Sequence, residues 1–274
     1  MEIRKNKSLK RSIFYIFALI FRKEFLVAYL KQFNLKFKIK VKDVVGRHIY
    51  KYQAHETELS NWVIKNINKL EGDILLDIGA NIGWYSILFY KSSSSKFRII
   101  AFEPDDINFN ILKQNLKLNN IENVEPHNIA LSEFSGKARL YRYGDSNLGR
   151  HSMLPINGKK KGGVIEVNTV NLDDFLKEKR LNDNKIKILK IDIEGYEYIA
   201  LSKAKNTLKN CSTVICEYSP VLMRKNNISP KKLIYLLNDS GLKPYILKMN
   251  KLKKISKEEL LSTEKVLDIL WIRN

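Results

Sequence analysis

Acidic residues stand at the ends of several short apolar runs in this chain of 274 residues. Asp77, Glu103, Asp192 and Glu217 each end or directly follow such a run. If the runs are parallel strands, their carboxyl ends meet at one edge of a sheet, where α/β folds bind their ligands. Carboxylates at that edge can accept hydrogen bonds from hydroxyl groups, take a proton from an alcohol or hold a divalent ion. The pattern therefore predicts a ligand site lined by acids.

The segment from Asp77 to Gly83, Asp-Ile-Gly-Ala-Asn-Ile-Gly, has the glycine spacing of a strand-to-helix turn that faces a ligand. Gly79 permits the tight turn, and Gly83 lets the next helix begin close to the sheet with free N–H groups at its start. A dinucleotide site needs G-x-G-x-x-G and a phosphate loop needs G-x-x-x-x-G-K-[ST], and this segment contains neither pattern. A nucleoside ligand without a pyrophosphate fits better.

Glu103 stands twenty residues after Gly83, where a doubly wound fold places an acid that accepts hydrogen bonds from ribose hydroxyls. S-adenosylmethionine is a nucleoside of the required kind, and the ammonium of its amino-acid end explains an acid, Asp77, in the turn. An ordinary strand-to-helix turn with an incidental glutamate is the alternative interpretation. The predicted cofactor-binding residues are Asp77, Gly79, Ala80, Asn81, Gly83, Glu103, Pro104 and Asn128.

Asp192 and Glu194 are separated by one residue at the end of another predicted strand, and Glu217 lies one strand further along. In a regular strand residues i and i+2 point to the same face, so both carboxylates could face one ligand. We expect a proton acceptor, or an acid cluster that binds sugar hydroxyls or a divalent ion. The alternative is structural, in that Glu194 caps the following helix and Lys190 neutralises an acid locally. Whether a metal binds stays open at this point.

The stretch 144–163 is rich in Gly, Ser, Asn and Lys and is long for a simple connection, so it could be a lid or a substrate loop. His151 lies in this stretch beside Ser152 and is a second candidate for the general base, although a lone histidine in a loop is more often incidental. His48 and His55 lie upstream, in a segment that could fold over the cofactor. The predicted catalytic residues are therefore Asp192, Glu194, Glu217 and His151.

Short apolar runs alternate with helical patterns from residue 73 onward. Strands that alternate with helices imply a mostly parallel sheet with helices on both faces. We therefore predict an α/β, Rossmann-like fold with a seven-stranded sheet. The predicted strands are 73–78, 97–103, part of 123–131, 186–193, 213–217, 245–248 and 267–272, with an added strand or hairpin at 136–143; the predicted helices are 82–90, 105–118, 196–208 and 230–238.

Composition restricts the class of protein. Hydrophobic residues make up 44% of the chain and charged residues 28%, so the chain can bury a core and is not disordered overall. No apolar run reaches the roughly 18–20 residues that a membrane-spanning helix needs. Cys211 and Cys216 match neither a disulfide framework nor a zinc ligand pair. A reducing, cytoplasmic location is therefore expected.

Basic residues are concentrated near the N-terminus. Residues 1–51 hold fourteen Lys and Arg against three acids, in a chain with a net charge of +20. This indicates an anionic partner, either nucleic acid or a membrane surface, although the Lys-, Asn- and Ile-rich composition of AT-rich genomes explains part of the charge. Residues 1–52 are predicted to be a basic, helical extension of a domain that spans 53–274.

The extension begins with basic residues and the apolar run from Ile13 to Phe21, after which no signal-peptide cleavage site follows. Two interpretations are open for residues 1–31. They form a helix in the interface of an anionic membrane, which would place the protein on the inner face of that membrane. Alternatively, they form a helix that packs on the main domain.

Five segments together resemble one enzyme family, the FkbM-type methyltransferases. They recur in family order over about residues 55–240, and they are Asp77–Ser86 (DIGANIGWYS), Phe102-Glu103-Pro104, Asn128–Ser132 (NIALS), Leu189–Glu197 (LKIDIEGYE) and Cys216-Glu217. The D-x-G-A-N-x-G and K-I-D-x-E-G patterns are the specific ones. The resemblance implies a class I methyltransferase fold and S-adenosylmethionine-dependent O-methyl transfer to a small molecule or glycan, such as a sugar of a cell-surface polysaccharide. It says nothing about residues 1–50.

Two other functions remain as alternatives. The charge suggests an RNA-directed methyltransferase, but the segment from Asp192 reads Asp-Ile-Glu-Gly and lacks the Asn/Asp-Pro-Pro-aromatic pattern of enzymes that methylate base amino groups. The chain also shows no separate RNA-binding motif, so no specific nucleic-acid partner is expected. A non-catalytic, membrane-associated module that keeps the fold is the other alternative, and the intact Asp77, Gly79, Gly83 and Glu103 argue against it.

Overall fold

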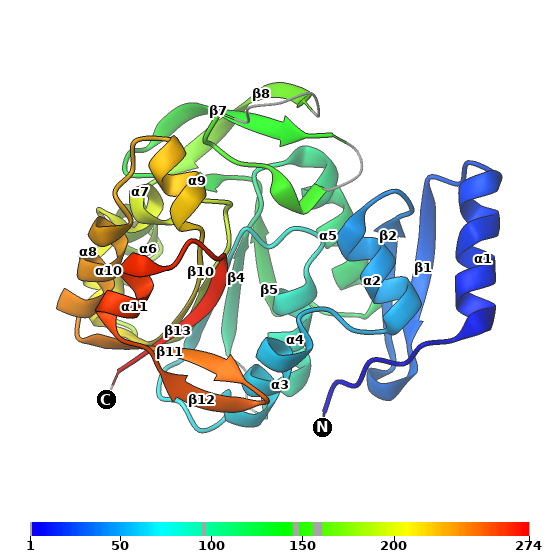
Figure 1. Ribbon diagram of the computed structural model, residues 1–274, viewed down its shortest axis with the longest axis horizontal. Coiled ribbons are helices and arrows are strands. Elements are labelled where there is room, and N and C mark those ends of the chain that lie inside the picture. The colour runs from blue at the N-terminus through cyan, green and yellow to red at the C-terminus, as the bar shows by residue number, and fades with distance from the viewer. Residues whose placement is uncertain (1, 95–96, 145–147, 156–160, 274) are drawn as a thin grey trace.

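The computed structural model describes residues 2–94, 97–144, 148–155 and 161–273, and its centre is a mixed sheet of eight strands (Figure 1). Five neighbouring strands are parallel, and the strands at the other end are antiparallel. In order across the sheet the strands are β12 (Lys251–Lys254), β11 (Leu242–Lys248), β13 (Leu267–Arg273), β10 (Cys211–Tyr218), β9 (Ile186–Ile191), β3 (Ile74–Ile78), β4 (Arg98–Phe102) and β5 (Val124–His127).

The seven predicted strands are all present, and β12 adds an eighth at the edge. Its sequence, Lys-Leu-Lys-Lys, is exposed throughout and offers no apolar run to recognise. The central strands β3 and β9 are buried along their whole length, as the near-continuous apolar sequence of a doubly covered parallel strand requires. Asp77 and Lys190 interrupt these two strands and lie beside each other in register.

Successive residues of the central strands face two separate hydrophobic cores. Leu76 and Leu189 face one core, whereas Leu75 and Ile188 face the other. The first core is closed by α6 (Leu172–Glu178), α7 (Glu197–Leu201), α8 (Lys205–Lys209), α10 (Pro230–Asp239) and α11 (Lys257–Ser262). The second is closed by α3 (Thr57–Asn66), α4 (Trp84–Ser92) and α5 (Asp106–Leu118). The single helix predicted over 196–208 is thus two short helices.

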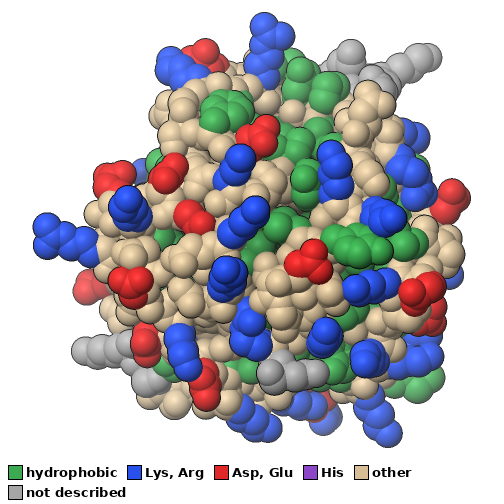
Figure 2. Space-filling model, turned by 90° about the vertical axis from the view of Figure 1, so that its left-hand side faces the viewer, with side chains coloured by type: hydrophobic (Ala, Val, Ile, Leu, Met, Phe, Trp, Pro, Cys, Tyr) green, Lys and Arg blue, Asp and Glu red, His purple; other side chains and the backbone are tan. Residues whose placement is uncertain are grey.

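A small three-stranded sheet lies beside the carboxyl ends of the central strands (Figure 1). It contains β6 (Ala130–Leu131), β8 (Lys161–Val170) and β7 (Gly136–Tyr143), in that order. The strand predicted at 136–143 is β7, and its partner β8 begins inside the stretch expected to be a loop. Residues 145–147 and 156–160 of that stretch lie outside the described residues. On the side of α8, α10 and α11, basic and acidic side chains are interspersed over the surface (Figure 2).

The N-terminal 52 residues are helical only in part, which corrects the prediction. Helix α1 (Leu9–Ile20) is followed by a hairpin of β1 (Phe25–Leu30) and β2 (Leu35–Lys40) and by α2 (Val44–Tyr52). The alternating sequence of β2 buries Leu35, Phe37 and Ile39, and the Phe37 ring lies 5.4 Å from that of Trp84. Residues 25–52 therefore share a core with the rest of the chain, and α1 lies outermost (Figure 1). Among the described residues, none of the helices combines the length and the apolar character needed to cross a membrane.

Candidate functional site

A cavity of about 530 Å³ opens at the carboxyl ends of β3, β4, β9 and β10. Asp77, Glu103, Asp192, Glu194 and Glu217 all line it. The cavity is closed on its other sides by α2, by the segment around His55 and by residues 149–153 beside β7. The edge at which the sequence predicts a ligand site is thus the edge where the structure has a cavity lined by acids.

The turn between β3 and α4 approaches the backbone of the next strand so closely that only glycine fits. Gly79 has φ 78°, and a Cβ atom on it would lie 2.1 Å from the carbonyl oxygen of Asp192. Gly83 has φ 90°, and a Cβ there would lie 2.5 Å from Leu112 of α5. Both glycines therefore have the roles that their spacing predicts: one allows the tight turn and the other allows helix α4 to pack closely.

Glu103 lies directly after β4, and its carboxylate holds the backbone of this turn. Its carboxylate accepts hydrogen bonds from the backbone N–H groups of Asn81, at 2.7 Å, and Asp105, at 2.9 Å. Burial, opposed by these two bonds, raises the pKa of Glu103 to about 8. Each carboxylate oxygen keeps a lone pair for a further donor, so Glu103 can still accept hydrogen bonds from a ligand in the cavity.

Two other predicted cofactor-binding residues differ in their position. Asn81 lines the cavity with φ 51°, and its buried side-chain oxygen accepts no hydrogen bond within the described part of the chain. Asn128 is exposed, and the cavity lining does not include it. Its amide instead donates to the carbonyl oxygens of Glu103 and Pro104, so it orders the chain just after β4. Asn81, unlike Asn128, has a polar atom that a ligand can satisfy.

Asp77 is 2% exposed and accepts a hydrogen bond of 2.5 Å from the hydroxyl of Ser86. Burial raises its pKa to about 6, although the Ser86 hydroxyl and the nearby Lys190 favour the carboxylate. Ser86 belongs to the first turns of α4, so the strand and the helix jointly fix the side chain of Asp77. Asp77 is thus a buried acid held at the cavity wall by a fixed donor.

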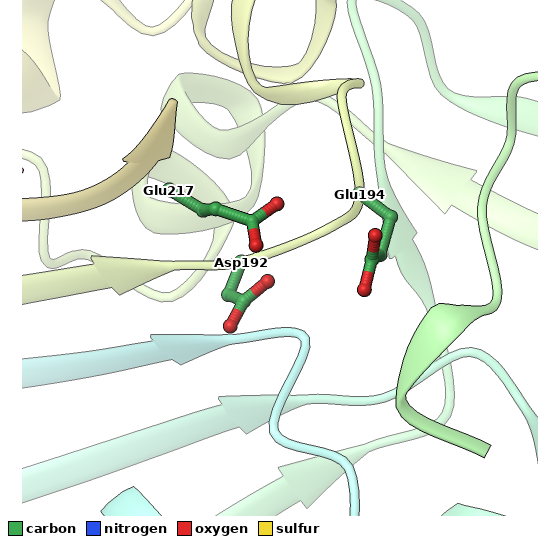
Figure 3. Close-up of side chains that lie close together, drawn as sticks. All are labelled: Asp192, Glu194 and Glu217. Carbon is green, nitrogen blue, oxygen red and sulfur yellow. The ribbon is translucent and has the colours of Figure 1, made fainter. Parts of the chain in front are cut away.

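The three predicted catalytic acids gather on one side of the cavity (Figure 3). One carboxylate oxygen of each of Asp192, Glu194 and Glu217 lies within 4.8 Å of the other two. The carboxylates of Asp192 and Glu217 lie near each other at the ends of neighbouring strands, and Glu194 reaches toward them from the loop. The three acids predicted from the sequence are therefore brought together by β10, which carries Glu217, and by the segment after β9, which carries Asp192 and Glu194.

The predicted strand over 186–193 is too long, so the alternation of a strand does not bring Asp192 and Glu194 together. Strand β9 ends at Ile191, so neither Asp192 nor Glu194 is in a strand. Glu194 adopts the left-handed backbone conformation, with φ 54°, which is uncommon for a residue other than glycine. This backbone angle, rather than the alternation of a strand, directs Glu194 to the cavity.

A neighbouring acid, Glu197, holds the turn that follows. Its carboxylate accepts hydrogen bonds from the N–H groups of Ile193, at 3.0 Å, and Gly195, at 3.1 Å. Burial raises the pKa of Glu197 to about 7. Helix α7 begins at Glu197 with Tyr196 as its N-cap and no side-chain cap, so Glu194 does not have the capping role of the structural alternative, and Glu197 instead holds the backbone just before the helix. Glu194 is left with its carboxylate facing the cavity and the guanidinium of Arg150, 3.9 Å away.

The protonation of the cluster is strongly perturbed. Burial, and then the charge of Asp192, raise the pKa of Glu194 to about 8. The same two causes raise the pKa of Glu217 well above its ordinary value, opposed by a hydrogen bond of 3.0 Å from the hydroxyl of Ser219. Carboxylates that share a small volume cannot all ionise near neutral pH, so the cluster can both hold and accept a proton.

Lys190 is the functional residue that sequence reasoning left as a local counter-charge. It is 2% exposed, lines the cavity, and its ammonium lies 3.0 Å from Asp192 and 5.1 Å from the ring centroid of Tyr85. Burial opposes its charge, but Asp192 and then Glu56 outweigh burial and raise its pKa. The run 186–191 reads Ile-Lys-Ile-Leu-Lys-Ile, and a lysine near the carboxyl end of this buried strand was the signal that could have revealed it.

The N-terminal part of the chain supplies another wall of the cavity. The His55 ring lies 3.1 Å from the carboxylate of Glu56, which accepts a 2.5 Å hydrogen bond from the hydroxyl of Tyr85. Val44 and Val45 of α2 also line the cavity. The segment around His55 folds over the site as the sequence analysis expected. Glu56, which was not among the predicted site residues, adds a further buried acid.

His151 also lines the cavity, but its ring is held by its own loop. The side chain is 6% exposed, its Nδ1 accepts a hydrogen bond of 3.1 Å from the N–H of Tyr143, and its Nε2 lies 3.8 Å from Asp105. His151 is thus a packed side chain on the cavity wall that contacts Asp105 rather than the cluster of three acids.

Comparison with known proteins places these features in a family. The model of the family described as "Methyltransferase FkbM domain" matches residues 77–243. The "Hexuronic acid methyltransferase AglP" of Haloferax volcanii is 27% identical over 184 residues, which are 66% of this chain and 68% of that protein. "Methyltransferase sdnD" of Sordaria araneosa is 29% identical over 150 residues, which are 45% of this chain and 57% of that protein. The crystal structure of an FkbM methyltransferase from Methylobacillus flagellatus covers 73% of this chain and 43% of that chain, with 16% identity and a TM-score of 0.46.

Proposed function

The chain belongs to the FkbM methyltransferase family, and from this premise we propose that it transfers a methyl group from S-adenosylmethionine to a hydroxyl of a glycan sugar. The observation that carries the choice of a hydroxyl acceptor is the cluster of Asp192, Glu194 and Glu217 at one wall of the cavity. An alcohol must lose its proton when it is methylated, and a carboxylate with a raised pKa is a suitable proton acceptor near neutral pH.

The residues around the cavity fit S-adenosylmethionine. Glu103 has acceptor capacity left for the ribose hydroxyls, and Asn81 offers a buried oxygen that has no donor within the described chain. Gly79 keeps the floor free of a side chain. The cofactor supplies a methyl group on a positively charged sulfonium when it is bound. Asp77, Glu103 and the acid cluster line the cavity, and the positive charge of the cofactor would favour their ionised forms, which in turn would stabilise that charge.

The acid cluster would orient and deprotonate the acceptor. The ammonium of Lys190 lies 3.0 Å from Asp192 and holds that carboxylate at the cavity wall, where it can also accept a hydrogen bond from a sugar hydroxyl. The pKa of Glu194 is raised to about 8, and its side chain is 18% exposed. Glu194 is therefore the acid best placed to take the proton, because it also contacts solvent. Glu217 then shares the proton within the cluster.

An acidic sugar is the acceptor class that the rim of the cavity favours. Arg150 and Lys225 line the cavity, and both side chains are exposed. A carboxylate on a sugar ring could pair with either cation while a neighbouring hydroxyl faces the acids. The relative from Haloferax volcanii is named a hexuronic acid methyltransferase, which agrees with this class.

A divalent metal at Asp192, Glu194 and Glu217 is a second proposal for the same cluster, because three carboxylate oxygens within 4.8 Å could hold one. The residues fit a metal less well than a proton, since the buried ammonium of Lys190 already lies against Asp192. Treatment with a chelator distinguishes the two. Activity that survives complete metal removal would exclude the metal.

The proposed function is tested by methyl transfer from labelled S-adenosylmethionine to oligosaccharides. We expect transfer to chains that contain glucuronic acid and weaker transfer to matched chains that contain glucose. A methyl group that is stable to alkali is an ether on a hydroxyl oxygen, whereas a methyl ester on the sugar carboxylate would be cleaved. If the protein binds S-adenosylhomocysteine but transfers no methyl group to any sugar, the assignment as a methyltransferase stands and the proposal of a glycan acceptor is rejected.

A further inference from the structure

Helix α1 exposes an apolar face to solvent. Leu9, Ile13, Ile16 and Ile20 recur at the spacing of one stripe along the helix, and all four are at least 43% exposed. A second stripe beside the first consists of Phe14, Phe17 and Phe21, which are 67%, 51% and 70% exposed. Seven exposed apolar side chains gathered on one face indicate a contact surface, because exposed apolar residues on a protein surface are otherwise scattered singly.

The opposite side of α1 attaches the helix to the protein. Tyr15 and Ala18 are the buried residues of the helix, and the Tyr15 hydroxyl donates to the carbonyl oxygen of Val41. Arg11 donates to the carbonyl oxygens of Asn6 and Lys51. The helix is thus oriented with its apolar face outward. In a protein that only needed α1 for its core, the apolar face would point inward.

Basic residues flank the apolar face at both ends. Residues 3–23 contain seven Lys and Arg and no Asp or Glu. Lys5, Lys7 and Lys10 lie at or before the start of α1, and Arg22 and Lys23 follow its end. On the opposite side of the molecule, basic and acidic side chains are interspersed (Figure 2). Residues 3–23 thus contribute +7 to the chain's net charge of +20, and this charge lies beside the surface that also exposes the apolar stripes.

A hollow continues this surface beyond the end of α1. It has a volume of about 840 Å³ and lies between the first hairpin and α5. Its apolar part includes Phe25, Val27 and Leu118, and three lysines also line it, namely Lys23, Lys38 and Lys117. The combination of apolar floor and lysine rim found at α1 therefore recurs beside it.

We propose that the outward face of α1, together with its flanking lysines and arginines, docks on an anionic lipid membrane. The helix would lie in the plane of the interface, with its two apolar stripes among the lipid headgroups and acyl chains and its cations against the lipid phosphates. A second copy of the chain is disfavoured as the occupant, because pairing two such faces would bring two clusters of positive charge together. An acidic, apolar protein surface is the remaining competitor.

The test is co-sedimentation of the full chain with vesicles. We expect binding to vesicles of phosphatidylcholine mixed with phosphatidylglycerol, weaker binding to phosphatidylcholine alone, and loss of binding at high salt. The double variant Phe17→Glu/Ile20→Glu should weaken binding roughly tenfold or more, because it removes two apolar contacts and adds two negative charges. The matched control is Met249→Glu/Leu252→Glu, which makes the same charge change at exposed apolar residues on another hairpin and should bind like the wild type.

Three results would overturn the proposal. They are absence of binding to the anionic vesicles, equal weakening by the two double variants, and a wild-type dimer in sedimentation analysis that the α1 variant dissociates while vesicles bind neither protein. Calorimetry with S-adenosylhomocysteine shows that each variant is folded. Methyl transfer to soluble oligosaccharides is measured separately, so failure of the membrane proposal and failure of the proposed function can be distinguished.

Discussion

The ammonium of Lys190 lies 3.0 Å from the carboxylate of Asp192, two residues further along the chain, and is almost completely buried. This ion pair joins the last strand residues of β9 to the acid cluster. Lys190 also lies beside Asp77 of the neighbouring strand β3. Its positive charge therefore acts both on Asp77, next to the turn of Gly79, and on Asp192 in the acid cluster.

Replacing Lys190 should therefore destabilise the protein. Lys190→Met leaves the half-buried carboxylate of Asp192 without its charged partner, and we expect a loss of about 1.5–3 kcal/mol in the free energy of unfolding. Lys185→Met is the matched control, because Lys185 pairs at 2.7 Å with Glu71 on the surface, where both side chains are more than 60% exposed. That variant should lose no more than about 1 kcal/mol. Urea unfolding of both measures the difference, and equal losses would contradict the assigned role.

Glu103 should carry a large part of the cofactor affinity. In Glu103→Ala the ribose hydroxyls lose a buried acceptor, which costs about 1–3 kcal/mol and lowers the affinity roughly 5–150-fold. Calorimetry with S-adenosylhomocysteine measures this. Glu122→Ala, at an exposed acid, is the control. Because Glu103 also holds two backbone N–H groups, Glu103→Gln shows whether charge or turn geometry is responsible. Unchanged affinity in both variants would remove Glu103 from the site.

The acid cluster should matter for turnover rather than for cofactor binding. Asp192→Asn, Glu194→Gln and Glu217→Gln keep the shape and remove the charge. We expect at least one of them to lower kcat by roughly 100-fold or more, the scale of general-base catalysis, with little change in affinity for S-adenosylhomocysteine. Wild-type turnover in all three variants would make the cluster structural, and His151 would be the next candidate base.

The stability of the protein should fall as the pH rises toward 8. Burial raises the pKa of Glu103 and of Glu194 to about 8, whereas an unfolded glutamate titrates near pKa about 4.3. Between these values the folded chain holds protons that the unfolded chain has released. The free energy of unfolding therefore decreases with pH across this window and levels off above it.

Glu56 acts in the opposite direction, since its pKa is lowered by His55 and Lys190 against the effect of burial. Its stabilisation is present above the unfolded pKa and is lost only at lower pH. Urea unfolding of the wild type and of Glu103→Gln, measured between the pKa of an unfolded glutamate and about pH 8, isolates the contribution of the raised pKa of Glu103. The variant should show the shallower slope, and parallel slopes would argue against a raised pKa at Glu103.

Gly79 should not tolerate a side chain. Gly79→Ala places a Cβ where it would lie 2.1 Å from the carbonyl oxygen of Asp192, in a left-handed backbone conformation. Gly163→Ala is the matched control, since Gly163 has φ 97° with nothing within 4 Å of its added Cβ. The control should lose only the conformational cost of about 1–2 kcal/mol. Gly79→Ala should lose more and should also weaken S-adenosylhomocysteine binding. Equal losses in unfolding experiments would mean that the backbone contact is unimportant.

The sequence alone determined the doubly wound sheet and the cofactor side of the site. Strands covered on both faces are mostly apolar, so β3 and β9 are visible as short runs that only Asp77 and two lysines interrupt. A turn that touches the next strand needs glycine, so Gly79 and Gly83 mark its place. Both requirements act on a few consecutive residues, so they can be recognised from the residue types in the sequence.

Other features depended on contacts between distant segments, and only the tertiary structure decided them. The hairpin at 25–40 forms because Leu35, Phe37 and Ile39 find a core that α4 and α5 provide. Glu56 reaches the cavity from a segment far from the strands that bound it. The direction of Glu194 follows from one left-handed backbone angle, held by the hydrogen bonds that Glu197 accepts in the same turn. Residue type does not encode such positions, because burial and pairing arise only when the segments meet.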